Sequence, residues 1–294
     1  MKVLVWLVRI LGALVALIVV VIVALISQGR GIASRSMPNP VPALAVLPDS
    51  SRVPRGAHIV EIVCSGCHAP ATTGQMTLSG GTENFFVIPN GPTLGVLYAP
   101  NITPGGMIRH HSDGQLARAI REGVSHDGKP MLVMPSDHFH EMSDRDLAAV
   151  IAYLRHQPAV VHEVPARSIN PVGYLMLGLR VATTSAMNSI AKPVGDPPDS
   201  GAAFGEYVAN LASCTVCHGP DLHGGHKGQL PPVGPNLTRL VHDRPFTTFE
   251  LALRHGVRPA GGALDPVLMP WPIYARLTDL EARAVYEYIR SLPS

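Results

Sequence analysis

The chain has little charge, and Asp, Glu, Lys and Arg together make up only 15% of its 294 residues. The formal net charge of +2 lacks the basic footprint that is typical of nucleic-acid binding. No segment shows an alternating strand pattern as strong as its helical patterns. Cysteine is equally scarce. All four cysteines lie in two short motifs, CSGCHAP from Cys64 and CTVCHGP from Cys214, so none is spare for another role.

The chain is long and is rich in glycine and proline. Its 294 residues, 46% of them hydrophobic, are enough for two domains with cores of their own. Gly and Pro number 28 each. Such a content predicts much loop and turn, with helices between the turns.

The N-terminal run from Val3 to Ile26 contains 24 residues and a single charge, Arg9. As a helix it rises about 36 Å, enough to cross a hydrocarbon core of about 30 Å. It has no polar face, which argues against a buried core helix. It is also longer than the usual apolar region of a cleaved signal peptide, and no clean A-x-A site follows it. We therefore expect a retained transmembrane anchor over residues 1–28, while cleavage stays open.

Matching stretches divide the rest of the chain into two related units. Three pairs share one offset of 135 residues: APNIT with GPNLT, VMPSDHFHEMSDRD with LMPWPIYARLTDLE, and AYLRHQP with EYIRSLP. The cysteine motifs are offset by 150 residues, so the first unit is longer between its cysteine motif and its Met-Pro. We assign the extra length to GGTENFFVIPNGPTLGVLY. A repeat of this length indicates two tandem domains rather than a solenoid. The expected segments are a Pro-rich spacer at 29–54, a first domain at 55–158, a linker at 159–200 and a second domain at 201–294.

Both units read as helical. Ser143 has an acid three residues on, and Thr278 with Glu281 forms a capping box, so each predicts the start of a last helix. Both last helices end shortly before a proline. Gly123 and Gly256 predict the ends of the central helices. The other predicted helices are 57–63, 115–122, 202–212 and 248–255, and we expect Tyr153 and Tyr288 to pack on the first helix of their own unit.

C-x-x-C-H is the attachment signature for c-type haem. The two thiols add to the porphyrin vinyl groups and the adjacent His binds the iron, and one helical turn brings all three to one side of the ring. A redox dithiol and a zinc site built from the four cysteines are rival interpretations. A zinc site leaves both histidines unexplained, and a dithiol lacks a thioredoxin-like βαβ setting. We therefore predict two covalently bound haem c groups. The predicted attachment residues are Cys64, Cys67, His68, Cys214, Cys217 and His218.

A sixth iron ligand has to come from elsewhere in each unit, and a thioether raises the iron potential. Met134 and Met269 are equivalent in the repeat, and each precedes a proline. His138 and His140 compete with Met134, but no histidine occupies the corresponding place in the second unit. The predicted iron ligands are His68, Met134, His218 and Met269. Core packing accounts for Met107, Met131, Met142, Met176 and Met187.

The other ring N–H of each proximal histidine is expected to donate to a carbonyl, which fixes the orientation of the imidazole. Pro100 and Pro235 are the repeat-matched candidates for that carbonyl and are counted with the cofactor-binding residues. The alternative, that both are ordinary turn prolines, stays open.

The order of these elements resembles the class I cytochrome c plan: C-x-x-C-H, P-N-[IL]-T, R-x-G-V, M-P and an A-Y-L-R-type helix. The chain is similar to the multihaem cytochrome c subunits of membrane-bound alcohol, gluconate and sugar dehydrogenases. The resemblance implies an all-α fold with two tandem class I cytochrome c domains behind an N-terminal transmembrane helix. Those subunits typically carry three haems and a C-terminal membrane segment, and this chain departs from both. A dihaem carrier resembling cytochrome c4 is a second possibility.

The resemblance implies haem attachment outside the bacterial cytoplasm. The flanking charges Lys2, Arg9, Arg30 and Arg35 are nearly balanced and leave the orientation open. We therefore expect a single pass through the inner membrane, with the haem domains on the periplasmic or outer face. The expected function is electron transport in a respiratory chain, without catalytic residues and without nucleic acid. Electrons would pass from a membrane dehydrogenase or quinol-oxidising complex to a terminal oxidase or soluble cytochrome.

Two questions stay open at this level. A dihaem redox enzyme, of peroxidase or thiosulfate-oxidising type, is the alternative function, so whether the chain is an enzyme is uncertain. Such an enzyme needs an iron that is open or unusually ligated, and Arg109, His110 and His111 lie either near a haem or in a surface loop. The linker segment 169–192 has an apolar stretch too short to span a membrane. It could pack between the haem domains, dock on a partner or lie on the membrane surface.

Overall fold

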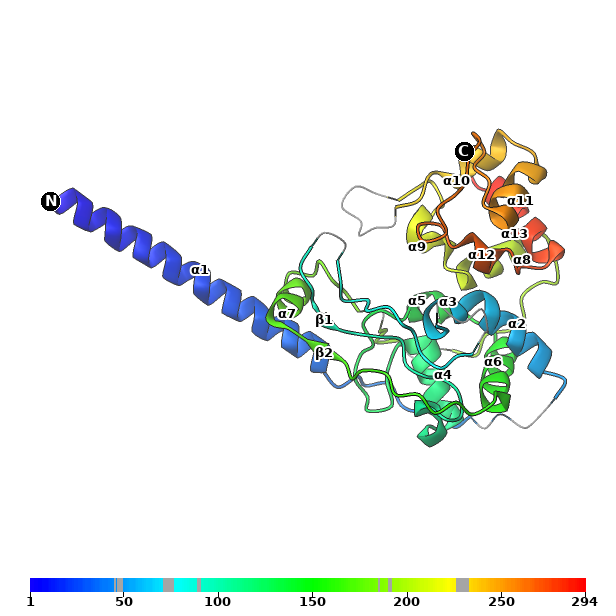
Figure 1. Ribbon diagram of the computed structural model, residues 1–294, viewed down its shortest axis with the longest axis horizontal. Coiled ribbons are helices and arrows are strands. Elements are labelled where there is room, and N and C mark those ends of the chain that lie inside the picture. The colour runs from blue at the N-terminus through cyan, green and yellow to red at the C-terminus, as the bar shows by residue number, and fades with distance from the viewer. Residues whose placement is uncertain are drawn as a thin grey trace.

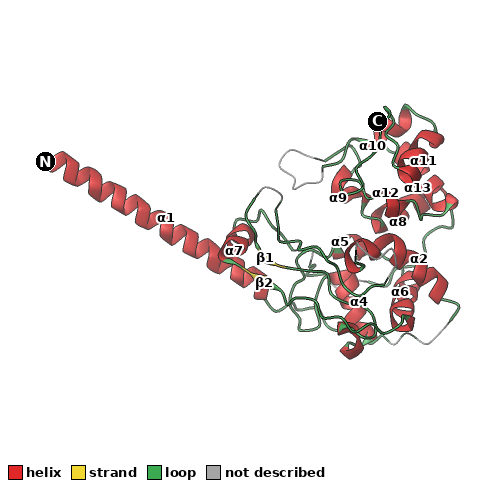
Figure 2. Cartoon of the chain, in the orientation of Figure 1, coloured by secondary structure: helices red, strands yellow, loops and turns green. Residues whose placement is uncertain are grey.

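A computed structural model describes the whole chain except residues 45, 47–49, 71–76, 89–90, 185, 190–191 and 226–232. A long N-terminal helix projects from a body that contains two helical units (Figure 1). Figure 2 shows helix throughout both units and very little strand. The mostly helical fold that the sequence predicts is confirmed.

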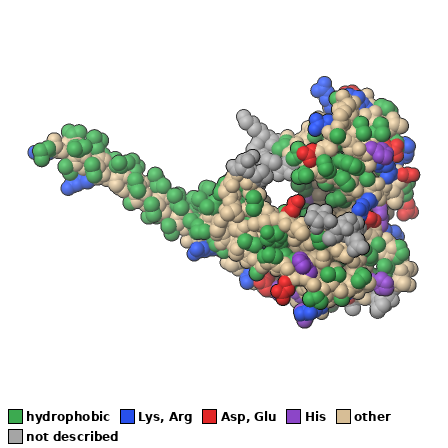
Figure 3. All heavy atoms as spheres, in the orientation of Figure 1, with side chains coloured by type: hydrophobic (Ala, Val, Ile, Leu, Met, Phe, Trp, Pro, Cys, Tyr) green, Lys and Arg blue, Asp and Glu red, His purple; other side chains and the backbone are tan. Residues whose placement is uncertain are grey.

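The projecting helix, α1 (Lys2–Ser34), is continuous over 33 residues. Its side chains are exposed up to residue 24, and the space-filling view shows hydrophobic side chains along its length (Figure 3). Among the described helices it alone is long and apolar enough to cross a membrane. Its buried residues, Gly29 and Ala33, lie near its C-terminal end, where it meets the body.

Each unit is built on a pair of packed helices, its first and its last. In the first unit α2 packs on α6, and in the second α8 packs on α13. Gly56 and Gly205 allow these close crossings, because a Cβ at either position would overlap a carbonyl oxygen of the partner helix. Tyr153 and Tyr288 lie against these two glycines, which confirms their predicted packing.

The bounds of these elements follow the chain order. The first unit contains α2 (Val53–Val63), α3 (Ser65–His68), η1 (Met107–His110), α4 (Asp113–Glu122), α5 (Ser136–Phe139) and α6 (Asp144–His156). The second contains α8 (Gly201–Leu211), α9 (Cys214–His218), α10 (Leu237–His242), α11 (Phe246–His255), α12 (Trp271–Tyr274) and α13 (Asp279–Ser291).

Local signals set the helix ends, as predicted. The side chains of Ser143 and Thr278 each accept a hydrogen bond from the backbone N–H three residues on, and Thr278 belongs to a complete capping box. Gly123 and Gly256 end α4 and α11 in the left-handed region, with φ of 65° and 62°.

The arginine of each R-x-G-V stretch joins the central helix of its unit to the last helix. Arg121 donates to the carboxylate of Asp144 at 2.7 Å and to the carbonyl of Met142. Arg254 donates to the carboxylate of Asp279 at 2.7 Å and to two carbonyls of the preceding turn. The repeated motif therefore fixes the same junction in both units.

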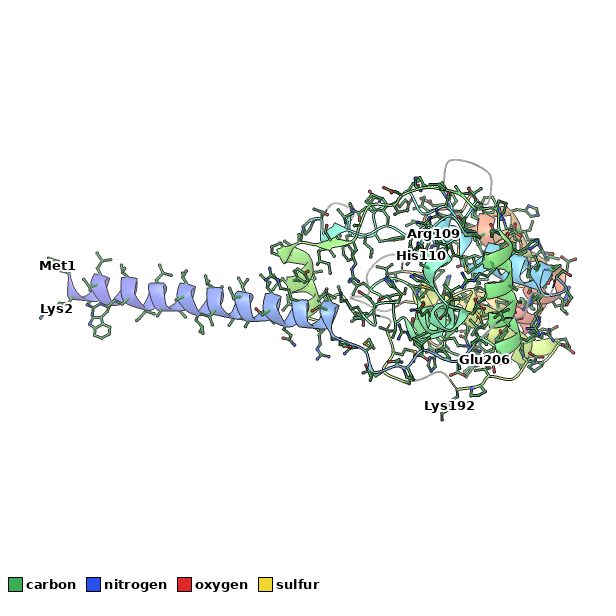
Figure 4. The ribbon with its side chains drawn as sticks, turned by 90° about the horizontal axis from the view of Figure 1, so that it is seen from below. Met1, Lys2, Arg109, His110, Lys192 and Glu206 are labelled. Carbon is green, nitrogen blue, oxygen red and sulfur yellow. The ribbon has the colours of Figure 1, made fainter. Side chains whose placement is uncertain are left out.

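The linker adds one more helix and one strand, which pairs with a strand of the first unit. β1 (Gly95–Val96) pairs antiparallel with β2 (Ser168–Ile169), and α7 (Pro171–Gly178) follows. The sequence predicts no strand here, because two-residue strands are too short to leave an alternating pattern. β1 lies in the extra length of the first unit. α7 packs against α1, in both Figure 1 and Figure 4, so it does not fill the space between the haem units.

The two units exchange apolar side chains across a reciprocal interface. Ile62 at the end of α2 is buried in the core of the second unit, and Leu211 at the end of α8 is buried in the core of the first. Leu211 lies one residue further from its cysteine motif than Ile62 does. The extra residue is taken up near Ser213, which has a left-handed φ of 56°.

Polar contacts repeat the same reciprocal pattern. His58 of the first unit bonds to Glu281 of the second at 2.7 Å, and the Tyr207 hydroxyl of the second donates to Asp146 of the first at 2.9 Å. Arg55 lies between the two acids and bonds to both. The units are therefore related by an approximate two-fold arrangement, in which equivalent surfaces meet.

Candidate functional sites

The first cysteine motif lies on the wall of a cavity inside its own unit. Because α3 starts directly after α2, Cys64, Cys67 and His68 all face this cavity. Its volume of about 300 Å³ lies in the range of ligand and cofactor pockets. Most of the lining is apolar, including Phe85, Leu97, Ile102, Leu116, Ile120 and Phe139. Such a site suits a large apolar cofactor.

The histidine of each motif bonds to the proline carbonyl that the sequence singles out. Nδ1 of His68 lies 2.9 Å from the Pro100 carbonyl oxygen, and Nδ1 of His218 lies 2.8 Å from that of Pro235. A carbonyl only accepts, so each imidazole carries its proton on Nδ1 and keeps the Nε2 lone pair for a metal. Burial lowers the pKa of both imidazoles, although the carbonyl hydrogen bond acts in the opposite direction.

The thiols lie in surroundings that disfavour the thiolate. All four are free of disulfides. Burial, with a smaller contribution from the neighbouring thiol, raises the pKa of Cys64 and of Cys214 to about 12. A reactive redox dithiol requires a lowered thiol pKa. Within the described part of the chain, no three His, Cys, Asp or Glu side chains converge on a common point, so the four cysteines form no zinc site there.

Met134 lines the first cavity, and its two histidine competitors do not. His138 instead lies 3.3 Å from the Thr215 hydroxyl of the second unit, and His140 donates to the Arg121 carbonyl at 2.9 Å. Met107 and Met131 line the same cavity, so their assignment to core packing alone is incomplete. Met142 also lines the cavity, but it is 2% exposed and belongs to the core of the unit, as predicted.

The second unit repeats the arrangement with less room beside its histidine. Met269 packs against the core of this unit and is followed by Pro270 and α12. Gly234 lies so close to His218 that a Cβ there would be 2.5 Å from Nδ1. The indole N–H of Trp271 is buried with no hydrogen-bond partner among the described residues. A carboxylate of a bound cofactor would supply the acceptor that this group lacks.

One of the three residues considered for a distal group faces the first cavity. His111 lines it and stacks on His126, with ring centroids 4.5 Å apart. Arg109 and His110 are exposed on η1 and bond to each other (Figure 4). Arg167 of the linker also lines the cavity. Sequence reasoning missed Arg167, because its distance along the chain from the cysteine motif hides the contact.

A groove of about 500 Å³ separates the first cysteine motif from the Met-Pro loop of the second unit. Gly66 and Cys67 line one side, and Pro270 and Ile273 line the other. The backbone of Gly66 lies close to Ile273, because a Cβ there would be 2.7 Å from Cδ1 of that side chain. The contact between His138 and Thr215 repeats this relation in reverse. Each cysteine motif therefore faces the segment that follows the Met-Pro of the other unit.

Tyr274 lies half-buried, close to both cysteine motifs. Its hydroxyl donates to the carbonyl of Ala212 at 3.1 Å. Burial raises its pKa, and Cys214, Cys217 and Cys67 are close enough to raise it further. A tyrosine in this position stays protonated, which suits its role as a hydrogen-bond donor.

Two family models match the chain, and each covers one of the units. The model described as cytochrome c oxidase, cbb3-type, subunit III matches residues 51–154. The model described as cytochrome c matches residues 202–293. The chain carries two cytochrome c domains. Domains of this kind imply haem c and a part in electron transport, as the sequence predicts.

Curated relatives are subunits of dehydrogenases. A nicotinate dehydrogenase subunit of Pseudomonas putida is 29% identical over 254 residues, which cover 78% of this chain and 20% of that protein. The cytochrome c subunit of the quinone alcohol dehydrogenase of Gluconacetobacter polyoxogenes is 33% identical over 37% of this chain and 27% of its own length. The gluconate 2-dehydrogenase cytochrome c subunit of Pantoea cypripedii is 36% identical over 29% of this chain and 21% of its own length. The cytochrome domains are thus distantly homologous to such subunits, although the chain spans only about a quarter or less of their length.

Proposed function

We propose that the chain is a membrane-anchored dihaem c-type cytochrome that passes electrons from a dehydrogenase or quinol-oxidising complex to a terminal oxidase or soluble cytochrome. The observation that carries the proposal is the repeated geometry of the two cytochrome c domains. In each, the histidine of C-x-x-C-H has Nδ1 committed to a proline carbonyl. When bound, the haem iron supplies the one-electron chemistry.

The protein's own residues attach, orient and shield the two cofactors. The cysteines hold the porphyrin covalently, and the carbonyls of Pro100 and Pro235 orient the imidazoles. Met134 and Met269 supply the sixth ligands. The apolar lining of the first cavity would keep water from the cofactor, and the indole N–H of Trp271 would be available to a cofactor carboxylate in the second unit. The proposed haem-binding residues are Cys64, Cys67, His68, Met134, Cys214, Cys217, His218 and Met269.

The proposed location is the bacterial inner membrane, with α1 as a retained single-pass anchor. Its length and exposed apolar surface support a span. Its last turns belong to the folded body, since Gly29 and Ala33 are buried, which supports retention rather than cleavage. The haem domains then lie on the periplasmic or outer face.

The proposed electron donor is a dehydrogenase, because the named relatives are dehydrogenase subunits. The match to the nicotinate dehydrogenase subunit covers 78% of this chain, so it extends into both cytochrome units. The cysteine motifs face each other's neighbouring loops, which supports electron exchange between the two haems within one chain.

Haem counting tests this proposal. The full-length protein, made in a bacterium that attaches haem c and purified in detergent, should bind two haems per chain by pyridine haemochrome and intact mass. Replacing Cys64 and Cys67 by Ala should leave one haem, and so should replacing Cys214 and Cys217. A parent chain with free thiols and no covalent haem would refute the proposal.

A dihaem redox enzyme is the second candidate, because His111 faces the first cavity beside His126. This function requires an open iron in the first unit. If the carrier function holds, reduced-minus-oxidised and ferric spectra should show two low-spin haems. A peroxidase assay should then detect no peroxide-dependent turnover. A high-spin haem with peroxide turnover that His111→Ala abolishes would favour the enzyme.

A further inference from the structure

We propose that α7 and the last turns of α1 form a foot that lies in the boundary between acyl chains and lipid headgroups. The foot consists of residues 25–35 and 171–181. It holds the first cytochrome unit at a fixed height above the bilayer. The inference rests on the proposed function in one respect, namely that α1 is a retained anchor.

The two helices of the foot are in close backbone contact. A Cβ on Gly29 would overlap the carbonyl oxygen of Tyr174, and one on Gly178 would overlap that of Leu25. Small residues allow this kind of close helix crossing in membranes. Leu177, 4% exposed, is buried at the same place. The helices thus interlock through glycines on both sides.

The contact lies at the level where the apolar run of α1 ends. The 24 residues from Val3 to Ile26 rise about 36 Å, slightly more than a hydrocarbon core of about 30 Å. Leu25 and Gly29, which contact α7, therefore lie at or just beyond the edge of that core. A helix attached there meets the interfacial layer of the bilayer and not bulk water.

The exposed side chains of the foot fit lipid better than a protein partner or water. α7 contains no charged residue, and Val172, Leu179 and Val181 are 39%, 50% and 50% exposed. They lie on or next to α7, which packs against the last turns of the apolar helix α1. Exposed aliphatic side chains at this level cost less free energy against the acyl-chain edge of a bilayer than in water.

Aromatic and basic side chains frame that apolar face. The guanidinium of Arg30 lies 5.3 Å from the centre of the Tyr174 ring. Arg30, Arg35 and Arg180 are exposed. Tyrosine and arginine are typical of the headgroup layer, where the ring lies at the interface and the cation meets phosphate. The occupant of this surface is therefore the lipid bilayer.

The foot is joined to the first cavity through backbone contacts. Asn170 caps α7 and also donates from its side chain to the Thr93 carbonyl at 2.7 Å. A Cβ on Gly173 would overlap the Leu94 carbonyl oxygen. The loop that contains Thr93 and Leu94 continues through β1 to Leu97, which lines the cavity. These contacts thus fix the distance between the first cytochrome unit and the membrane.

Site-directed spin labelling tests the foot in the full-length, haem-loaded protein in phosphatidylcholine–phosphatidylglycerol liposomes. Val172→Cys and Val181→Cys each introduce one thiol on the foot. Val161→Cys, at an 86% exposed valine elsewhere in the linker, is the matched control. Power saturation should show several-fold lower accessibility to a water-soluble nickel chelate at 172 and 181 than at 161, and higher accessibility to oxygen. Equal nickel accessibility at all three positions would overturn the proposal.

Two controls separate this outcome from other failures. In a haem-loaded parent chain all four native cysteines are thioethers, so the parent should take up no label. Labelling of the parent indicates that haem attachment has failed, and the foot is then tested by lipid protection of amides 171–181 from hydrogen exchange. Gly29→Leu should separate the helices and raise nickel accessibility at 172, whereas Gly31→Leu, with open space around it, should not. An unchanged signal in Gly29→Leu would contradict the proposed packing.

Discussion

The two cytochrome units share one helical plan and differ in what surrounds it. In the first, the cavity beside the cysteine motif is lined by Phe85 and Leu97 of the extra length and by Arg167 of the linker. The His162 ring lies 2.8 Å from the Ser79 carbonyl, and Asn101 donates to the Val160 carbonyl at 2.8 Å. In the second, Gly234 packs directly on His218. The same extra chain carries β1 and reaches α7, so the added length gives the first unit its connection to α1.

The surroundings of the two cysteine motifs differ, but at the reciprocal interface the two units make nearly equivalent contacts. Ile62 and Leu211 are exchanged between the cores, and each acid at the start of a last helix accepts bonds from the other unit. The two units are therefore joined by similar contacts, although the surroundings of their cysteine motifs differ. Substitutions at matched positions can test which differences matter, from the largest expected effect to the smallest.

Replacing Met134 by Ala should lower the potential of one haem and open its iron, and replacing Met269 by Ala should do the same for the other. Axial ligands move haem potentials over a range of about 0.8 V, so a drop on the order of 0.1 V or more is expected. Spectroelectrochemical titration of the detergent-solubilised protein measures both potentials. Met131→Leu, in the same cavity as Met134, is the control and should leave the ligands of both haem irons unchanged. Unchanged potentials in both alanine variants would rule out the two ligands.

Replacing Glu281 by Gln should destabilise the interface between the units. The carboxylate is 3% exposed and meets both Arg55 and His58. Removing one partner of a fully buried pair costs about 3–5 kcal/mol, and the effect here is smaller because Arg55 is 30% exposed. The glutamine retains the capping box at Thr278. Chemical denaturation followed by haem absorbance measures the loss.

Asp146→Asn is the matched variant on the other half of the interface. Asp146 shares Arg55 with Glu281 and accepts from Tyr207, so the effects of the two substitutions should not add in the double variant. Simple additivity would contradict a shared network and would indicate two separate contacts.

Replacing Gly234 by Ala should disturb the second unit, and Ala99→Gly at the equivalent place in the first should not. The added methyl would meet the His218 ring, and overpacking of this kind costs about 1–3 kcal/mol. The expected result is a lower denaturation midpoint and an altered ferric spectrum of the second haem only. A fully tolerated Gly234→Ala would indicate that the ring has room to shift.

The sequence predicted those parts of the fold and site that depend on local signals. The caps at Ser143 and Thr278 and the ends at Gly123 and Gly256 lie within a turn of the residues they control. The proline carbonyls were found because the repeat placed Pro100 and Pro235 at matching positions.

Contacts between distant segments left no such signal. His58 and Glu281 are 223 residues apart, and Tyr207 and Asp146 are 61 apart. Ile62 and Leu211 have the pattern of ordinary core positions of their own helices. For α7 the sequence left three locations open, because an uncharged eight-residue helix can pack on many apolar surfaces. Its pairing with α1 depends on two glycines that resemble any others in a glycine-rich chain.

The smallest expected effect is a pH dependence of the interface at Glu281. Burial by itself would raise the pKa of Glu281, but hydrogen bonds from His58 and Thr278 and the nearby charges lower it from 4.5 to about 2. Because the folded pKa is below the unfolded one, the stabilisation is present above about pH 4.5 and is lost as the pH falls toward 2. Unfolding midpoints measured from about pH 6 to about pH 2 should fall more steeply for the parent chain than for Glu281→Gln, whose uncharged side chain has no proton to gain. Parallel curves would show that carboxylates other than Glu281 govern the acid transition.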